Sequence, residues 1–79
     1  MWWMFKKLSE AGSIVMYAYS RENHNLDGRI SINRDTEDIV MVQPSEKDKS
    51  SAFSRDKALQ KAWWMIKEGY PDSRQIACG

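Results

Sequence analysis

The sequence has little of the chemistry that cross-links small domains. Its 79 residues include one cysteine, Cys78, and one histidine, His24. An internal disulfide is therefore excluded, and a structural zinc site, which needs four ligands, is not expected. A chain of this length forms one small core that often needs a disulfide, a metal or a partner chain, so oligomerisation is the remaining source of stability that we expect. A lone thiol is typical of a reducing compartment, and we expect a cytoplasmic protein.

Charge of one sign and long apolar runs are also missing. The 12 basic and 11 acidic side chains give a net charge of +1. No overall field therefore draws the chain to nucleic acid. No apolar run approaches the roughly 20 residues of a transmembrane helix. The four glycines are far apart, so no glycine-rich phosphate loop is present, and we expect no cofactor.

Three short segments are rich in β-branched and aromatic residues, which predicts strands at residues 13–20, 29–33 and 39–43. Polar residues separate these segments and favour turns, most clearly where residues 21–28 end in Asp-Gly. Pro44 ends the third strand.

A long helix is predicted next. Ser45, in the pattern Ser45-x-x-Asp48, and the pair Ser50-Ser51 are both candidate starts, because a serine side chain satisfies free N–H groups of the first turn. The helix should run to about Glu68. Gly69 suits the left-handed position beyond the last turn, and Pro71 prevents continuation.

These elements predict an α+β fold, a three-stranded antiparallel meander followed by one long C-terminal helix packed on one sheet face. Residues 74–78 could add a short edge strand. The N-terminal residues could form a strand, a short helix or a loose arm. We expect a single domain over residues 1–79, divided into an aromatic arm (1–12), a β-meander (13–43), a helical segment (45–69) and a tail (70–79).

The sequence has more apolar side chains than one helix packed on one sheet face can cover. The first and third strands are apolar on both faces, whereas one helix covers one face. Helical periodicity places two aromatic residues, Phe53 and Trp64, on the outer helix face. The stripe expected to face the core comprises Ala52, Leu59, Ala62, Trp63, Ile66 and Tyr70.

This surplus leads to the main functional expectation. Either the N-terminal arm folds over the rings, or a second chain covers them, since exposed apolar patches mark interaction sites. We predict a non-catalytic protein–protein interaction module that homodimerises with an identical subunit or docks on another protein. The candidate partner-binding residues are Trp2, Trp3, Phe5, Tyr17, Tyr19, Phe53 and Trp64.

An alternative is a single-stranded nucleic-acid-binding module, in which bases stack on rings while lysines follow phosphates. Its candidate residues on the outer helix face are Lys57, Lys61, Trp64 and Lys67.

An enzyme is not expected. His24 has no nucleophile with an orienting carboxylate near it in the sequence. A metal site is not expected either, because turn formation explains the acidic residues better than a calcium loop does. These residues are Asp27, Asp35, Glu37 and Asp38.

Overall fold

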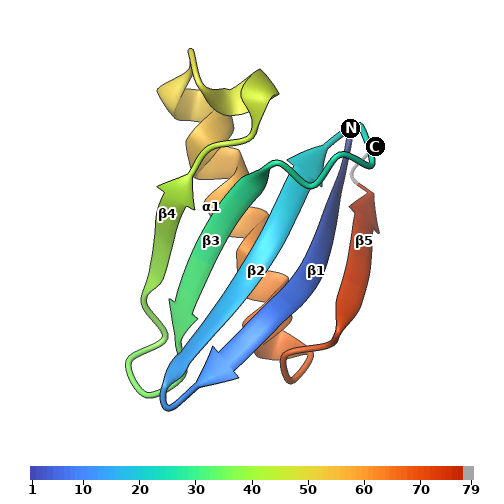
Figure 1. Ribbon diagram of the computed structural model, residues 1–79. Helices are drawn as coiled ribbons and strands as arrows, with labels where there is room; N and C mark the ends of the chain where they lie inside the picture. The colour runs from blue at the N-terminus through green and yellow to red at the C-terminus, as the bar shows by residue number, and fades with distance from the viewer. Residues whose placement is uncertain (78–79) are drawn as a thin grey trace.

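The computed structural model describes residues 1–77, which form one five-stranded sheet and one long helix (Figure 1). Neighbouring strands are antiparallel in the spatial order β4-β3-β2-β1-β5. The elements in chain order are β1 (Trp2–Ala11), β2 (Ile14–Arg21), β3 (Gly28–Asn33), β4 (Ile39–Gln43), the 3₁₀ turn η1 (Glu46–Asp48), α1 (Ala52–Lys67) and β5 (Ser73–Ala77).

The α+β class is confirmed, but the expected number of three strands is wrong. The N-terminal arm is strand β1, which pairs with β2 on one side and with β5 on the other. The meander therefore has four strands before the helix, and β5 returns to the opposite edge. Apolar residues 2–5 run without alternation, so periodicity did not reveal a strand. In the sheet, Trp3 and Phe5 face the helix, while Trp2 lies on the other face.

The ends of α1 follow the local sequence closely. The Ser51 hydroxyl oxygen accepts a hydrogen bond from the Ser54 N–H at 3.2 Å and caps the first turn. At the other end, Gly69 has a positive φ of 77°. The Tyr70 N–H donates to the Met65 carbonyl at 2.7 Å, which closes a Schellman motif. Of the two predicted starts, the helix uses Ser50-Ser51, whereas Ser45 precedes the 3₁₀ turn η1. The predicted end at Gly69 is confirmed.

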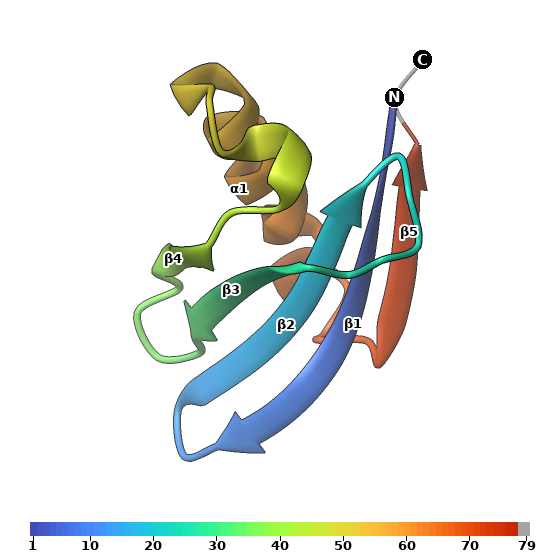
Figure 2. The same ribbon diagram turned by 45° about the horizontal axis from the view of Figure 1, so that its top comes forward.

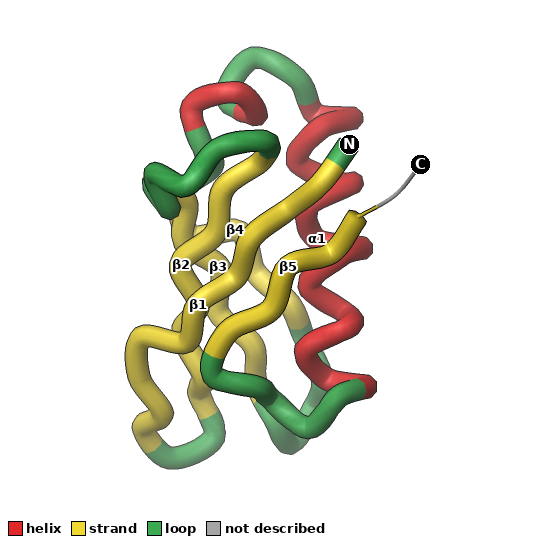
Figure 3. The backbone as a smooth tube through the Cα atoms, turned by 90° about the vertical axis from the view of Figure 1, so that its right-hand side faces the viewer, coloured by secondary structure: helices red, strands yellow, loops and turns green. Residues whose placement is uncertain are grey.

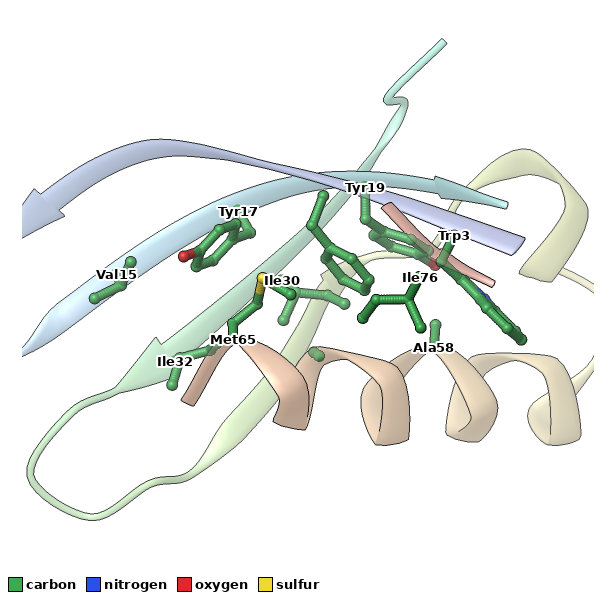
Figure 4. Packing of buried hydrophobic residues seen from close by; sticks show 11 residues of the cluster. Trp3, Val15, Tyr17, Tyr19, Ile30, Ile32, Ala58, Met65 and Ile76 are labelled. Carbon is green, nitrogen blue, oxygen red and sulfur yellow. The ribbon is translucent and has the colours of Figure 1, made fainter. Parts of the chain in front are cut away.

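The core lies between the sheet and α1 (Figure 4). The helix contributes Ala58, Ala62 and Met65, all completely buried. The predicted helix stripe is therefore partly wrong, since Trp63 is 39% exposed and Ala52 is also exposed. The reason is the size of the sheet side chains, because small alanines let the helix approach a layer of large rings. The buried sheet residues are Trp3, Phe5, Val15, Tyr17, Tyr19, Ile30, Ile32 and Ile76.

A buried polar cluster ties the segment after β4 to β2. The Tyr19 hydroxyl donates to Asp48 Oδ2 at 2.8 Å and accepts from the Ser45 N–H at 2.9 Å. Arg21 Nε faces Asp48 Oδ1 at 3.2 Å as an ion pair without hydrogen-bond geometry. Burial raises the pKa of Tyr19 far above its ordinary value, so its hydroxyl stays protonated and can donate.

Asp27 extends this cluster at the start of β3. Its carboxylate accepts from the Ser45 hydroxyl at 2.6 Å and from the Glu46 N–H at 3.0 Å. Burial alone would raise the pKa of Asp27, but these hydrogen bonds outweigh it and hold the pKa below its ordinary value. The start of η1 is therefore fixed to the sheet by charge and hydrogen bonds.

The sheet face away from α1 is partly covered by the chain itself. Figure 2 shows the β2–β3 loop crossing in front of β1 and β2 on that face. Its His24 ring lies 5.2 Å from the Trp2 ring, and beneath it Ala18 and Ser20 are buried. Part of the apolar surplus is thus covered internally. The exposed large apolar residues that remain on this face are Leu8, Ile14, Val40 and Val42.

Candidate interaction surface beside strand β5

Four of the predicted partner-binding rings lie inside the chain. Trp3, Phe5, Tyr17 and Tyr19 are at most 1% exposed. The Phe5 and Tyr19 rings stack at 5.9 Å. The Tyr17 hydroxyl donates to the Pro71 carbonyl at 2.7 Å, which joins β2 to the connection before β5. These four side chains build the core, so they offer no surface to a partner.

The other predicted rings remain accessible. Trp2 is half-buried beside His24. Phe53 is 71% exposed and Trp64 is 41% exposed on α1. Trp63, which we expected in the core, has almost the same exposure as Trp64. The helix thus carries three exposed aromatic side chains, of which only Trp64 lines the groove described next.

A groove of about 380 Å³ separates α1 from β5. Figure 3 shows β5 at the near edge of the sheet, with β1 behind it and α1 on the right. Trp64 and Ile76 give the groove apolar walls, and two cationic side chains flank them. The lining residues are Lys61, Trp64, Arg74, Ile76 and Ala77; we call this the α1–β5 groove.

The backbone of β5 is open on the side away from β1. The Lys7 N–H donates to the Asp72 carbonyl at 2.8 Å. Together with the register, this bond shows which residue pairs of β1 and β5 are hydrogen-bonded. In an antiparallel pair, hydrogen-bonded and non-hydrogen-bonded residue pairs alternate. Counting in steps of two from Asp72, the backbone N–H and C=O groups of Arg74 and Ile76 therefore bond to β1. The N–H and C=O groups of Ser73, Gln75 and Ala77 therefore point outward; we call them the open edge.

Arg74 occupies part of this open edge. Its guanidinium donates to the Gln75 carbonyl, and its Nε lies 2.7 Å from Glu68 Oε1. The hydrogen bond to Glu68 raises the pKa of Arg74, which remains charged. A charged side chain across a free carbonyl discourages indiscriminate strand pairing.

Three lysine ammonium groups lie over aromatic rings, and one of them, Lys61, lines the groove. Lys61 Nζ lies 5.3 Å from the Trp3 ring centroid, and Lys67 Nζ lies 5.1 Å from that of Trp64. Lys57 similarly lies 5.7 Å from the Phe53 ring. Within residues 1–77, none of the three forms an ion pair. The groove is therefore a basic surface as well as an aromatic one.

The acidic residues weighed for metal binding do not come together. Asp27 precedes β3, whereas Asp35, Glu37 and Asp38 follow it, so they lie at opposite ends of the strand. No cluster of three or more His, Cys, Asp or Glu side chains suited to a metal occurs in residues 1–77. Cys78 lies outside the described residues.

Part of this surface is predictable from the sequence. Trp64 was placed on the outer helix face, and the tail was considered for an edge strand that the structure has as β5. The roles of Arg74 and Ile76 were missed. Their alternation within a five-residue strand was the available signal, but nothing local indicated β1 as the partner strand.

No helix in the described part of the chain is both long enough and apolar enough to span a membrane. No family model, curated protein or solved structure matches the chain.

Proposed function

We propose that the chain is a non-catalytic protein–protein interaction module that binds a segment of a partner protein in the α1–β5 groove. The observation that carries this proposal is the position of Trp64, exposed beside an open strand edge. Tryptophan is enriched among residues that dominate binding energy, because its ring buries a large area at low entropic penalty. Ile76 adds an apolar wall that is itself fixed in the core.

A partner protein fits this groove better than a second copy does. Two-fold pairing of β5 with its own copy would bring together Lys61 and Arg74 from both chains. Like charges in close contact disfavour such an interface. We therefore expect a monomer in size-exclusion chromatography with light scattering at high micromolar concentration. A stable dimer that persists in Trp64→Ala would show that the chain associates through another surface.

The proposal is tested by selecting ligands for the wild-type chain from a phage library of random dodecapeptides. We expect selected peptides to bind at least tenfold more weakly to Trp64→Ala. The matched control is Trp63→Ala, which removes a neighbouring tryptophan of nearly equal exposure outside the groove lining. If no peptide is selected, or if both variants bind the peptides equally, the groove is not the interaction site.

A second candidate function is binding of single-stranded nucleic acid. Lys57, Lys61 and Trp64 recur at helical spacing along one side of α1, and neither lysine has a carboxylate partner within residues 1–77. Bases would stack on Trp64 while these lysines and Lys67 contact phosphates. Titration of a labelled oligothymidylate at two salt concentrations tests this candidate. Binding that falls steeply with salt supports it, and failure to bind at low salt removes it.

The proposed setting is the cytoplasm. Support comes from the single cysteine in the sequence, since a protein without a possible internal disulfide suits a reducing compartment.

A further inference from the structure

We infer that the segment bound in the α1–β5 groove is an extended acidic peptide that adds a sixth strand to the sheet beside β5. This inference rests on the proposed function, and it names the chemistry of the partner. Two features of the groove carry it: backbone groups on β5 that lack a neighbouring strand, and the ammonium group of Lys61, which forms no ion pair within residues 1–77.

The backbone requirement is met only by another extended chain. Gln75 directs both its N–H and its C=O away from β1, so one residue of an incoming strand can exchange two hydrogen bonds with it. Ser73 and Ala77 extend the same row of donors and acceptors on either side. Strand addition at a sheet edge uses this pattern, in which main-chain bonds supply affinity and side-chain pockets supply specificity. A nucleic acid offers phosphates but no matching ladder of N–H and C=O groups.

Side chains of the added strand would alternate between two surroundings. Gln75 points to the sheet face away from α1, so the residue paired with it points the same way. Its two neighbours then point into the groove, one beside Ile76 and Trp64 and the other beside Arg74. A segment that alternates apolar and acidic residues places one kind at both groove positions and the other kind on the opposite sheet face. Either the apolar residues meet Ile76 and Trp64, or the acidic residues meet Lys61 and Arg74.

The charge requirement selects an acidic segment. On the helix side of the new strand lie Lys61 and Arg74. On the other side lies Lys6, which is exposed, is paired in register with Ser73 and forms no ion pair within residues 1–77. An acidic residue therefore meets a cation whichever way it points. Arg74 already pairs with Glu68, and a carboxylate of the segment adds a second partner for its guanidinium when the incoming strand displaces it from the Gln75 carbonyl.

The inference is tested with a capped decapeptide of alternating glutamate and valine, titrated into the full chain by calorimetry. We expect this peptide to bind, and the corresponding lysine–valine peptide to bind at least tenfold more weakly. A glutamate–valine peptide N-methylated at its four central residues loses the donors needed in either register, and we expect it to bind at least tenfold more weakly too.

Variants of the chain test the same backbone contact from the other side. Gln75→Pro removes an outward N–H while leaving the bonds between β5 and β1, and proline is tolerated on edge strands in this position. We expect it to weaken binding of the glutamate–valine peptide at least tenfold, whereas Gln75→Ala, which keeps the N–H, should change binding less than threefold. If Gln75→Pro does not fold, the comparison of the methylated and unmethylated peptides with the wild-type chain decides alone.

Three outcomes overturn the inference: the glutamate–valine peptide does not bind, the lysine–valine peptide binds as well, or N-methylation has no effect. Each is distinguishable from failure of the proposed function. If library peptides that depend on Trp64 are recovered but are neither acidic nor sensitive to N-methylation, the groove binds proteins without strand addition. If the chain binds the oligothymidylate but not the peptides, the basic surface binds nucleic acid.

Discussion

The two edge strands of the sheet, β4 and β5, differ in how closely α1 packs against them. β4 and β5 each contain five residues, and each has an unpaired side within the described chain. Beside β4 the helix packs closely, and Ile39 and Met41 lie partly buried against the core. Beside β5 the α1–β5 groove remains. The helix therefore packs against one edge strand and leaves a groove beside the other.

The cause is where α1 is anchored. The segment that leads from β4 into the helix is fixed by buried charge around Asp48, so α1 starts close to that edge. The helix then crosses the sheet to reach the connection before β5, which Tyr17 holds through the Pro71 carbonyl (Figure 1). A polar cluster at one edge of the sheet thus positions a groove at the other edge.

The buried polar cluster around Asp48, which we call the anchor, should make the largest single contribution to the free energy of unfolding. Asp48→Ala removes the buried carboxylate that faces Arg21 and accepts from Tyr19, and we expect it to lower the free energy of unfolding by about 3–5 kcal/mol. Urea unfolding followed by circular dichroism measures the change. Asp56→Ala, which removes an exposed helix carboxylate, is the control and should change stability by less than about 0.5 kcal/mol. A loss below about 1 kcal/mol would show that the anchor is not what holds η1.

The packing of β5 against the core should depend mainly on one buried side chain, Ile76. Ile76 is 7% exposed in the core, and we expect Ile76→Ala to destabilise the chain by about 2–3 kcal/mol through lost packing. Val42→Ala on β4, where the valine is 54% exposed, should change stability by less than about 0.5 kcal/mol in the same urea experiment. Equal effects of the two substitutions would contradict the different packing of the two edges.

The link between β2 and the start of β5 should contribute less. Tyr17→Phe removes only the hydroxyl that donates to the Pro71 carbonyl, and we expect a loss of about 1 kcal/mol. Thermal unfolding can detect it. Tyr70→Phe is the matched control, because the Tyr70 hydroxyl forms no hydrogen bond within residues 1–77. A control that destabilises as much as Tyr17→Phe would argue against a specific role for the bond to Pro71.

The smallest expected effect is the pH dependence of the anchor. Because the folded-state pKa of Asp27 is lowered, its stabilising contribution is present above the ordinary aspartate pKa of about 4 and disappears as the pH falls through the folded-state value. Asp27→Asn should therefore flatten the acidic limb of the stability curve, measured by urea unfolding between about pH 2 and pH 7. Asp56→Asn should leave that limb unchanged. An unaltered limb in Asp27→Asn would show that its hydrogen bonds do not stabilise the folded state.

The local sequence predicted those parts of the fold that depend only on neighbouring residues in the chain. Strand β4 occupies the residues predicted for it, and Gly69 ends the helix because only its immediate neighbours decide that turn. The position of β1 in the middle of the sheet depends on pairing with residues far along the chain. The rotation of α1 likewise depends on the rings it meets, so Trp63 was misplaced while Met65 went unrecognised.

The candidate site divides in the same way. Trp64 was recognised because helical spacing alone sets its direction. The open edge was not recognised as a site, because it requires knowing which strand borders β5 and which groups remain unpaired. Four aromatic residues assigned to the surface are core residues, because β1 and β2 turn them toward the helix. A surplus of rings in the sequence thus indicated a large core before it indicated an interface.

The most direct test of the account compares the two edges in one measurement, by following backbone amide signals in NMR while the glutamate–valine decapeptide is added. We predict that the largest shifts fall on Ser73, Gln75 and Ala77, with the Trp64 indole signal following them, and that Ile39 and Met41 on β4 stay in place. Shifts confined to β4, or spread evenly over the lysines of α1 with none on β5, would contradict the claim that β5 is the edge that receives a partner.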